Sequence, residues 1–330
     1  MPEIPTAAGG LGRVLVVADP LHTFATYKDS TFAMMRELAR RGVRLAACEP
    51  AHLHWRSGEP VTALVREIEL TGAANDWFRA VAQRRAALRE FDAVLMRKDP
   101  PFDAEYFYAT HLLQQAEREG ARVFNRPAAL RDHPEKLALT EFAEWAPPTL
   151  VTRSAEAIRA FHAEHRDIIL KPLDGMGGRG IFRVGPDGLN LGAVIETLTQ
   201  HGHTTIMVQR FLPAIAQGDK RVLVIGGEPV PYALARIPQG GEVRGNLAAG
   251  GRGVAQPLSA VDEAIARALG PRLAARGLLL VGLDIIGEHL TEVNVTSPTC
   301  FQEITQQTGY DVAARFVDAL QVARAAAPHP

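Results

Sequence analysis

Alternating apolar and polar residues near the end of the chain predict two short β-strands within residues 281–299. Val281, Leu283 and Ile285 alternate with their neighbours, and a second run repeats this period after a turn near Gly287–His289. A period of two sends successive side chains to opposite faces of a sheet. We therefore predict a β-hairpin in which each strand has one apolar face.

Three polar residues interrupt the apolar strands of this hairpin: Asp284, Glu292 and Asn294. A three-residue loop places Asp284 opposite Glu292 on one face, whereas a two-residue loop places them on opposite faces. We predict the three-residue loop. Two carboxylates and an amide oxygen on one face form an oxygen-only site that suits Mg²⁺ or Mn²⁺, with nucleotide phosphates as further ligands. The alternative is a solvated edge hairpin, whose polar residues simply face water.

The first third of the chain has the pattern of strands alternating with helices. This order favours a parallel sheet with crossover helices. The first turn lacks GxGxxG, so the dinucleotide-binding fingerprint is absent. The expected elements are strands within 13–20, 43–48, 91–103 and 121–125, and helices at Ser30–Arg41 and about 104–119.

Charged side chains gather at or just beyond the carboxyl ends of these strands, the edge at which open α/β sheets bind ligands. Lys28, Asp29 and Arg97 are among them. Arg97 is the best ligand candidate, because a guanidinium can form two parallel hydrogen bonds to a carboxylate. Ordinary loop polarity is the alternative, and Asp99 before two prolines is equally consistent with a turn.

Two lysines in the middle of the chain lie in different contexts. Residues 131–149 are predicted to form a linker helix that carries Lys136, and nothing else in this segment marks that lysine. Lys171 ends a strand in residues 167–184, and a glycine-rich loop and a second strand follow it. Closely spaced glycines let backbone N–H groups approach an anion, so this unit is a candidate phosphate site. A long β-turn is the alternative.

A glycine-rich stretch at 238–253 is the second candidate ligand loop. Residues 239–253 hold six glycines and two arginines, Arg244 and Arg252. With almost no large apolar residue it cannot offset its own ordering entropy, so we expect it to be mobile without ligand and to act as a lid. A disordered insertion is the alternative. The pattern around it predicts helices at about 189–200, 259–276 and 310–325, a strand at 204–213 and a hairpin at 218–238 that turns at Gly226–Gly227.

Composition and charge narrow the class of protein. The 330 residues include 36 Lys and Arg against 37 Asp and Glu, a net charge of -1, which leaves no basic excess for binding nucleic acid or an anionic membrane. No apolar run reaches the ~18 residues that a membrane span needs. Residues 1–12 lack the architecture of a signal peptide and are expected to be a flexible lead-in. Two cysteines are too few for a disulfide framework, which favours the cytoplasm.

The motifs and their order resemble those of the ATP-grasp ligases, and within that superfamily those of the bacterial glutathione synthetases. The resemblance rests on MRKDPPFD, LKPLDGMGGRGIFRV, GDKRVLV, ARIPQGGEVRGNLAAGGRG and VGLDIIG…LTEVNVTSPT, which together span almost the whole chain. The glycine-rich lid and TEVNVTSPT are specific to the family. The Asp–Glu–Asn trio marks only the superfamily.

The resemblance implies an α/β and α+β fold. An N-terminal Rossmann-like domain with a parallel sheet is expected at 13–127, an ATP-grasp fold of two α+β subdomains at 128–325, with its lid at 238–253, and a tail at 326–330. The implied activity is an ATP-dependent ligation of γ-glutamylcysteine with glycine through an acyl phosphate, by a homo-oligomer. Such chemistry asks the protein for positioning and charge stabilisation, and no nucleophilic side chain is needed.

The resemblance also assigns roles to individual residues. Asp284, Glu292 and Asn294 would hold two Mg²⁺ ions, with Mn²⁺ as an option and Glu292 as the bridge. The residues implied for ATP are Lys136, Lys171, Gly175, Gly177, Gly178, Gln209, Arg210, Phe211, Leu212, Asp219 and Asn294. The residues implied for charge stabilisation during catalysis are Lys171, Arg221, Arg236 and Arg252. The residues implied for the dipeptide are Lys28, Asp29, Ser30, Arg97, Arg221, Arg236, Arg244, Arg252, Ser297, Pro298 and Thr299.

Three alternatives to this function stay open. The same parts would serve another ATP-grasp carboxylate–amine ligase, such as a dipeptide or glutamate ligase. A nucleotide-binding regulator without chemistry is a second alternative, although both lysines and the Asp–Glu–Asn trio are intact. A plain α/β binding module is the third, and it leaves the arginines of the glycine-rich lid unexplained.

Overall fold

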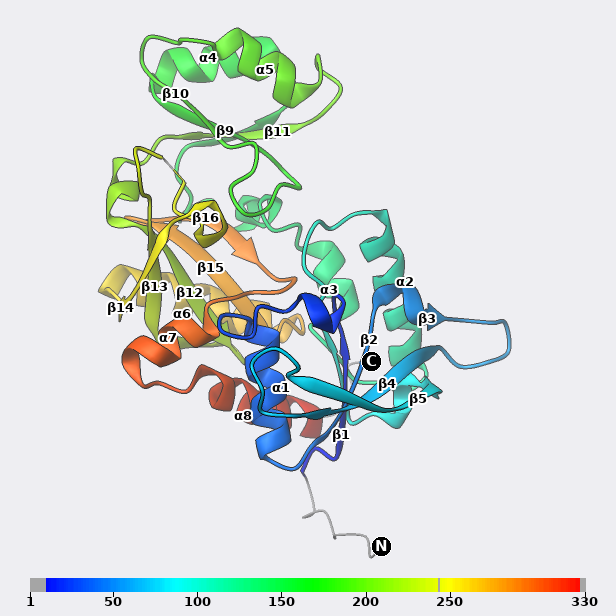
Figure 1. Ribbon diagram of the computed structural model, residues 1–330. Coiled ribbons are helices and arrows are strands. Elements are labelled where there is room, and N and C mark those ends of the chain that lie inside the picture. Colours follow the sequence, from blue (N-terminus) through cyan, green and yellow to red (C-terminus); the bar gives the residue numbers. More distant parts are fainter. Residues whose placement is uncertain (1–9, 243, 327–330) are drawn as a thin grey trace, which may run out of the picture.

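The computed structural model describes residues 10–242 and 244–326. The flexible lead-in expected at 1–12 and the tail expected at 326–330 therefore fall mostly outside the described residues. Three sheets make up the described part of the chain, and helices cover them (Figure 1). Within the described residues, no helix is long and apolar enough to cross a membrane.

The first sheet confirms the predicted alternation of strands and helices. Its central strands run parallel, and helices α1 (Ser30–Arg40) and α2 (Ala104–Arg118) cover opposite faces. The apolar side chains at alternate positions of the first strand explain this, since Val14 packs in the cluster that includes α1 and Leu15 in the cluster that includes α2. The strand order is β3 (Leu53–His54), β4 (Thr62–Leu70), β2 (Arg44–Cys48), β1 (Arg13–Val17), β6 (Ala93–Met96) and β7 (Val123–Phe124).

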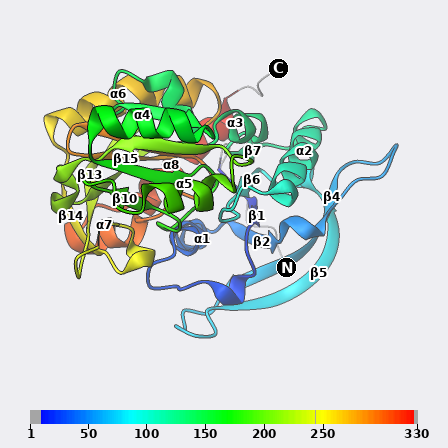
Figure 2. The ribbon, with the colours of Figure 1, turned by 90° about the horizontal axis from the view of Figure 1, so that it is seen from above.

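A long antiparallel hairpin extends one edge of this sheet, and the sequence pattern does not predict it. Strand β5 (Phe78–Ala87) pairs with β4 along its whole length. Most of the β5 side chains are exposed, so the strand lacks the apolar alternation that would reveal it. The hairpin lies in the lower part of the molecule (Figures 1 and 2), and Trp77 at its turn is buried against Phe24 and Phe32.

The linker helix predicted at 131–149 is wrong. The segment contains the end of helix α3 (Pro127–Asp132) and a separate 3₁₀ helix, η4 (Leu137–Phe142). Pro134 lies between these two helices, and because proline disfavours helical backbone in the residue before it, one continuous helix cannot form. Lys136 therefore sits at the start of η4 rather than on a long exposed helix.

A small antiparallel sheet forms the top of the molecule (Figure 1). The helices α4 (Ala155–His165) and α5 (Leu191–Thr199) cover one of its faces, and Ile158, Leu170 and Val208 share the core between them. The predicted helix at 189–200 is thus confirmed. The strand order is β10 (Phe182–Val184), β9 (Ile168–Pro172), β11 (Ile206–Arg210) and β8 (Thr149–Thr152).

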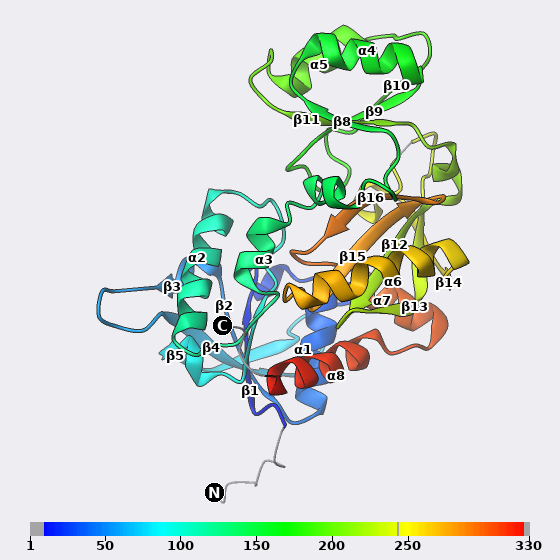
Figure 3. The same cartoon turned by 180° about the vertical axis from the view of Figure 1, so that it is seen from behind.

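A five-stranded antiparallel sheet lies below the small sheet, and α6 (Ala260–Ala275) and α7 (Phe301–Thr308) pack on it. The hairpin turn at Gly226–Gly227 is confirmed, whereas α7 is not predicted by the sequence pattern. The last helix, α8 (Val312–Ala325), returns to pack against α1 (Figure 3). The strand order is β14 (Arg252–Pro257), β13 (Glu228–Ile237), β12 (Asp219–Ile225), β15 (Leu280–Ile286) and β16 (His289–Asn294).

The β15–β16 hairpin reaches the predicted pairing by a different route. Its loop has two residues, Gly287 and Glu288, and not the three we predicted, because Ile286 pairs with His289. The register shifts between Asp284 and Ile285, so that Thr291 is an extra residue in β16. This β-bulge restores Asp284 opposite Glu292, on one face of the sheet.

Candidate active site

Strand register gathers six predicted site residues on one face of the five-stranded sheet. Asp219 pairs with Arg236, Arg221 with Asp284, Asp284 with Glu292, and Gly282 with Asn294. Opposite residues of an antiparallel sheet point to the same face. The face is therefore strongly polar although most of it is buried. The six residues are Asp219, Arg221, Arg236, Asp284, Glu292 and Asn294.

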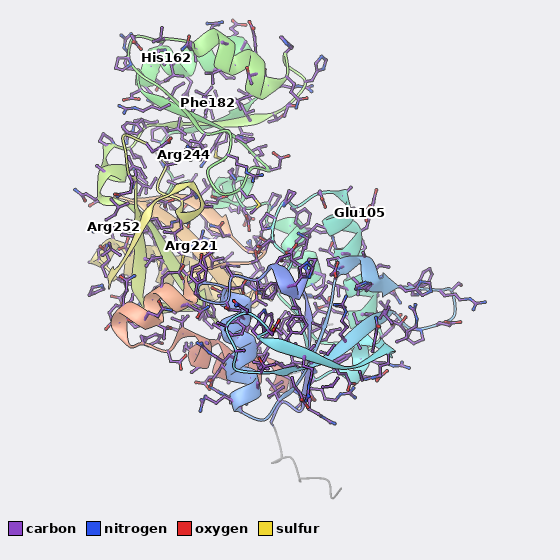
Figure 4. All side chains as sticks on the ribbon, in the orientation of Figure 1. Glu105, His162, Phe182, Arg221, Arg244 and Arg252 are labelled. Carbon is purple, nitrogen blue, oxygen red and sulfur yellow. The ribbon has the colours of Figure 1, made fainter. Side chains whose placement is uncertain are left out.

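This face lines a cavity of about 300 Å³ between the two antiparallel sheets. The small sheet and its glycine-rich loop close the other side, and residues 244–248 contribute part of the wall. In Figure 4, Arg221 lies within the five-stranded sheet and Arg244 lies between that sheet and the small one. Lysines, arginines, carboxylates and glycines from distant parts of the sequence thus meet in one place.

Two lysines line the cavity, one at the start of η4 and one in β9 of the small sheet. Lys136 Nζ forms a 2.9 Å ion pair with Glu292 Oε1 and donates a 2.6 Å hydrogen bond to the carbonyl oxygen of Gly175. Burial opposes the charge of Lys136, but Glu292 outweighs it and raises the pKa of the lysine above its usual value. Lys136, which only the resemblance singled out, therefore joins the glycine-rich loop to β16.

Lys171 comes from β9 of the small sheet and donates a 3.2 Å hydrogen bond to the carbonyl oxygen of Thr291. The bulge takes Thr291 out of the regular pairing with β15. Lys171 is almost fully buried, and burial lowers its pKa to about 8, with partial compensation from Glu292. At neutral pH it is a charged group with few partners, which is the state that a phosphate would stabilise.

The lowered pKa of Lys171 predicts a pH dependence of nucleotide binding. Its side chain is mostly a charged ammonium below pH 8 and mostly a neutral amine above it. Above pH 8, binding of a nucleotide phosphate to the ammonium therefore requires the uptake of a proton. We expect the affinity for ADP, measured by calorimetry without metal, to fall by up to about tenfold per pH unit above pH 8. Lys171→Gln should bind ADP weakly and lose this dependence. An affinity of the unaltered protein that stays constant up to pH 10 would contradict the assignment.

A buried network of two arginines and two aspartates occupies the centre of the face. Arg221 contacts both carboxylate oxygens of Asp284, at 2.6 and 3.2 Å, and Arg236 bonds Asp284 at 2.9 Å and Asp219 at 2.5 Å. Burial favours a neutral Asp284, but the two guanidiniums outweigh it and hold its pKa well below the usual range. Burial raises the pKa of Asp219 to about 6, and its Oδ1 atom has no hydrogen-bond partner in the described part of the chain.

Glycine is required where Arg221 passes over the sheet. A Cβ atom on Gly282 would lie 2.8 Å from Cδ of Arg221, which is too close for two carbon atoms. Gly178 meets a similar constraint in the glycine-rich loop, because its φ is +81° and a Cβ would lie 2.8 Å from Oδ1 of Asn246. The first glycine makes room for the arginine, and the second lets the predicted lid approach the loop.

The described residues of the predicted lid lie over the cavity. Arg244 forms a 2.8 Å ion pair with Glu242 and approaches the carbonyl oxygen of Gly178 at 3.4 Å. Position 243, inside the lid, lies outside the described residues. The contact between residues 244–246 and the glycine-rich loop places the lid over the side of the cavity where the phosphate-binding candidates lie. Its mobility without ligand remains a prediction.

Arg252 lies outside the cavity. It is exposed at the start of β14, where it pairs with Ile237, while its neighbour Gly253 pairs with Arg236. Because alternate residues of a strand face opposite ways, Arg252 and Arg236 point to different faces. Figure 4 shows Arg252 lower down on β14, away from Arg244. In this structure it contributes no contact to the site that the resemblance assigned to it.

Four candidates from the first domain, Lys28, Asp29, Ser30 and Arg97, also fall outside the cavity lining, although some of them support it. Arg97 is buried and donates to Thr31 Oγ1 at 3.1 Å and to the carbonyl oxygen of Pro298 at 3.0 Å. Asp29 caps α1, and Ser30 accepts a hydrogen bond from the backbone of Phe301. Arg97 and Ser30 thus connect α1 of the first domain to the segment 298–301 beside the cavity. Lys28 is exposed beside Tyr27.

All the other predicted site residues line the cavity. On the small sheet, Gln209 donates to Thr149 Oγ1 at 3.0 Å, and the guanidinium of Arg183 lies 3.7 Å from the ring centre of Phe211. On the opposite wall, Ser297 donates to Asp99 at 2.5 Å. The cavity-lining candidates are Lys136, Lys171, Gly175, Gly177, Gly178, Gln209, Arg210, Phe211, Leu212, Asp219, Arg221, Arg236, Arg244, Asp284, Glu292, Asn294, Ser297, Pro298 and Thr299.

Glu135 is a cavity residue that sequence reasoning missed. Its Oε1 accepts hydrogen bonds from the backbone of Val295 at 2.9 Å and of Thr296 at 3.1 Å, and from Thr296 Oγ1 at 2.8 Å. Burial, and then the nearby Glu292, raise its pKa. It ties the start of η4 to the segment that follows Asn294. Its position next to Lys136 was the available signal, but one Glu–Lys pair is common in helices.

The oxygen donors of this cavity fit a hard divalent cation. Glu292 and Asn294 lie beside Asp284, and Asn294 uses its amide N–H on the carbonyl oxygen of Gly282, which leaves its Oδ1 as a possible ligand. The described residues contain no cluster of three His, Cys, Asp or Glu in metal-binding geometry, and the set here is instead two carboxylates and one amide. Oxygen donors of this kind favour Mg²⁺ or Mn²⁺.

Known protein families match almost the whole chain. The family model described as prokaryotic glutathione synthetase, N-terminal domain, matches residues 13–131, and the one for its ATP-grasp domain matches residues 135–309. The glutathione synthetase of Ralstonia nicotianae is 62% identical over 94% of this chain and 95% of its own. That of Bordetella parapertussis is 58% identical over 94% of this chain and 99% of its own.

Solved structures with the same fold are more distant in sequence. D-cycloserine synthetase DcsG superimposes with a TM-score of 0.65 at 16% identity, over 95% of this chain and 100% of that one. The ATP-grasp ligase PsnB in complex with minimal precursor, Mg and ADP gives a TM-score of 0.58 at 23% identity, over 95% of this chain and 98% of that one. At these identities the likeness establishes the fold, and it confirms the expected ATP-grasp architecture.

Proposed function

Because the chain belongs to the prokaryotic glutathione synthetase family, we propose that its cavity joins γ-glutamylcysteine to glycine, with ATP converted to ADP and phosphate. The cavity is the one bounded by the two antiparallel sheets and the lid at 238–253. It carries cations for phosphates and carboxylates, and oxygen donors for a metal, within one enclosed space. We keep the domain limits of 13–127 and 128–325 as part of the proposal.

The reaction needs two steps because a carboxylate is a poor electrophile. An oxygen of the cysteinyl carboxylate attacks the γ-phosphorus of ATP, the bond to the β-phosphate oxygen breaks, and an acyl phosphate and ADP result. The amine of glycine then attacks the acyl carbon, its extra proton is lost, and phosphate leaves with the C–O bond electrons. Each step moves negative charge over short distances, so correctly placed cations are the main requirement.

The cavity supplies these cations from both sheets. Lys171 from the small sheet and Lys136 from the linker would hold the nucleotide phosphates, together with the N–H groups of the glycine-rich loop. Arg221 and Arg236 would stabilise the transferring phosphoryl group and the substrate carboxylate. Their contacts with Asp284 hold both guanidiniums in place before substrate arrives.

A divalent cation fits this scheme. ATP-grasp ligases in general use ATP and Mg²⁺. Here Asp284, Glu292 and Asn294 would hold the ion, and two ions, with Mn²⁺ as an option, belong to the proposal. When bound, the metal supplies charge neutralisation and alignment of the nucleotide phosphates. In the structure Lys136 is paired with Glu292, so binding of nucleotide and metal would separate this pair and give each group a new partner.

One observation carries the proposal: lysines from two separate segments contact β16, the strand of Glu292 and Asn294, inside a single cavity. The direct test is phosphate release by the purified protein with ATP and Mg²⁺. Release should require γ-glutamylcysteine and glycine together, and one tripeptide should form per phosphate. Release that depends on a different carboxylate–amine pair, such as glutamate or another dipeptide, would assign the chain to another ligase reaction.

The lid gives a prediction of its own. An acyl phosphate hydrolyses in water, so the lid over the cavity should protect it. Replacing residues 239–250 by a few glycines should leave ADP affinity nearly unchanged but lower the ratio of tripeptide formed to ATP consumed several-fold. Parallel assays of tripeptide and phosphate measure the ratio. If the shortened variant still makes one tripeptide per ATP, the loop is only a spacer.

Limited proteolysis tests the same lid without altering it. A trypsin cut after Arg244 should be fast in the ligand-free protein. ATP analogue, Mg²⁺ and γ-glutamylcysteine together should slow it, because a ligand shifts an equilibrium only through contacts that differ between its states. Cleavage after exposed Arg89, which lies in neither the lid nor the cavity, is the internal control and should not change.

Cellular location and assembly complete the proposal. Cys48 and Cys300 are buried free thiols, which agrees with a reducing cytoplasm. We also propose a homo-oligomer, and light scattering of the purified protein would test its mass.

A further inference from the structure

A second cavity, of about 750 Å³, lies apart from the one between the sheets. It forms where the C-terminal end of α2 and strand β7 meet α8, the end of α6 and the Gly226–Gly227 turn, elements that can be followed from behind in Figure 3. Within the described residues, the two cavities share no lining residue. Its volume is in the range of sites for small organic molecules.

The walls of this second cavity are strongly basic. Four arginines line it, Arg118, Arg122, Arg126 and Arg315, against the single acidic residue Glu117. The whole chain is almost neutral, with a net charge of -1, so this is a local concentration of positive charge. Burial raises the pKa of Glu117 to about 7, and its carboxylate therefore cancels little of that charge.

Three of these guanidiniums bond neutral oxygen atoms. Arg122 donates to the carbonyl oxygens of Arg324 and Ala326, Arg315 to that of Ile225 at 3.1 Å, and Arg118 to Gln115 Oε1 at 3.3 Å. In the described part of the chain, Arg118, Arg122 and Arg315 form no ion pair with a carboxylate. A guanidinium prefers a charged planar partner such as a carboxylate or phosphate.

The same cavity has an apolar wall beside the arginines. Phe124, Leu279 and Val322 contribute large apolar side chains, and Val322 is 73% exposed. Burying such surface against a ligand is favourable. Cationic and apolar walls together favour a ligand that has both an anionic group and an apolar surface.

We propose that this second cavity binds a small organic anion that has an apolar body and a carboxylate, phosphate or sulfonate head. The arginines would take the head, and Phe124, Leu279 and Val322 the body. This inference is independent of the reaction assigned to the other cavity. It concerns a site that bridges the first sheet and the five-stranded sheet, because Phe124 belongs to one and the β12–β13 turn to the other.

The fluorescent anion 1-anilinonaphthalene-8-sulfonate is a suitable probe, because it combines a sulfonate with aromatic rings. It should be titrated into the full-length protein with ADP and Mg²⁺ at saturation, which fill the cavity between the sheets. We expect one bound probe per chain with enhanced fluorescence. Octanoate should displace it at a concentration at least about tenfold lower than acetate, since the two share a head group and differ only in apolar length.

Two variants and one control locate the site. Arg118→Gln should weaken binding of the probe about three- to tenfold, and Ala323→Trp, which fills the cavity, should abolish it. Arg89→Gln makes the same change at an exposed arginine that lines neither cavity, and it should leave probe binding unchanged. Turnover and melting temperature of all three should stay close to those of the unaltered protein.

Three results would overturn the proposal. Displacement of the probe by ADP and Mg²⁺ would place it in the other cavity. Equal affinity for Arg118→Gln, Ala323→Trp and the unaltered protein would place it away from the arginine-lined cavity. Equal competition by octanoate and acetate would mean that the apolar wall takes no part.

Discussion

Glu292→Gln is expected to lower the turnover of ATP by at least about 10²-fold. The substitution keeps the shape of the side chain and removes the charge that would help to hold Mg²⁺ beside the phosphates. It also weakens the pair with Lys136, but glutamine can still accept a hydrogen bond from this lysine. The free energy of unfolding should therefore fall by only about 1–2 kcal/mol. Steady-state phosphate release and chemical denaturation measure the two effects.

Glu288 offers a matched control for this experiment. It lies in the two-residue turn of the same hairpin and is exposed. Glu288→Gln makes the same charge change at a residue that does not line the cavity. Its turnover and stability should match those of the unaltered protein. Near-normal phosphate release by Glu292→Gln, at saturating Mg²⁺, would remove the metal site from this hairpin.

Asp284→Asn is expected to damage both folding and activity. Asp284 is 2% exposed and lies between Arg221 and Arg236. Removing its charge leaves two buried guanidiniums with only Asp219 as a countercharge, and breaking a buried pair in this way costs about 3–5 kcal/mol. The loss of a metal ligand should lower turnover by about 10²-fold as well. Denaturant unfolding and phosphate release should both show large losses.

A substitution at a second buried aspartate serves as a control that separates the loss of stability from the loss of activity. Asp262 is fully buried on α6, pairs with Lys220 and does not line the cavity. Asp262→Asn should destabilise the fold to a similar extent and keep turnover near normal at temperatures where it remains folded. If Asp284→Asn lost stability but kept its activity, Asp284 would have only a structural role.

Acid should act on the two aspartates of this network in opposite directions. The pKa of Asp284 is depressed in the folded state, so its contribution to stability is present above the unfolded value of about 3.9. It is lost as the pH falls from there through the lower, folded pKa. Asp219 has the opposite sign, because burial raises its pKa to about 6. Its ionised carboxylate therefore opposes folding at neutral pH, and this penalty shrinks as the pH falls below about 6.

Local patterns in the sequence predict most strands and helices, and the two clearest misses have different causes. The parallel strands and the β12–β13 hairpin follow from apolar periodicity. Strand β5 does not, because most of its side chains are exposed and carry no apolar stripe, and it forms by pairing with β4 along its whole length. The helix expected at 131–149 overlooked the effect of Pro134 on the residue before it.

The site residues follow the same division. Asp284, Glu292 and Lys171 could be found because they are polar residues in or beside apolar strands. The resemblance assigned Arg252 to the site, but the direction of its side chain depends on the register between β13 and β14. Glu135 has no distinctive neighbours in the sequence, and its importance appears only when the backbone of Val295 and Thr296 is brought to it by the fold.

The extra residue in β16 has a consequence for how this hairpin tolerates changes in length. Thr291 has no paired residue in β15, although its hydroxyl donates to the carbonyl oxygen of Asp284. A version of the chain without it would therefore form a regular two-residue hairpin and still set Glu292 against Asp284. That shorter hairpin would lose the carbonyl oxygen that receives Lys171. Deleting a residue from the turn itself leaves the same number of residues between Asp284 and Glu292, so a regular two-residue hairpin would again set them opposite each other. It would also exchange the faces of Leu290 and Thr291 and turn the buried Leu290 away from the core. In a scan of single-residue deletions across 287–291, we therefore expect the deletion of Thr291 to cost the least stability.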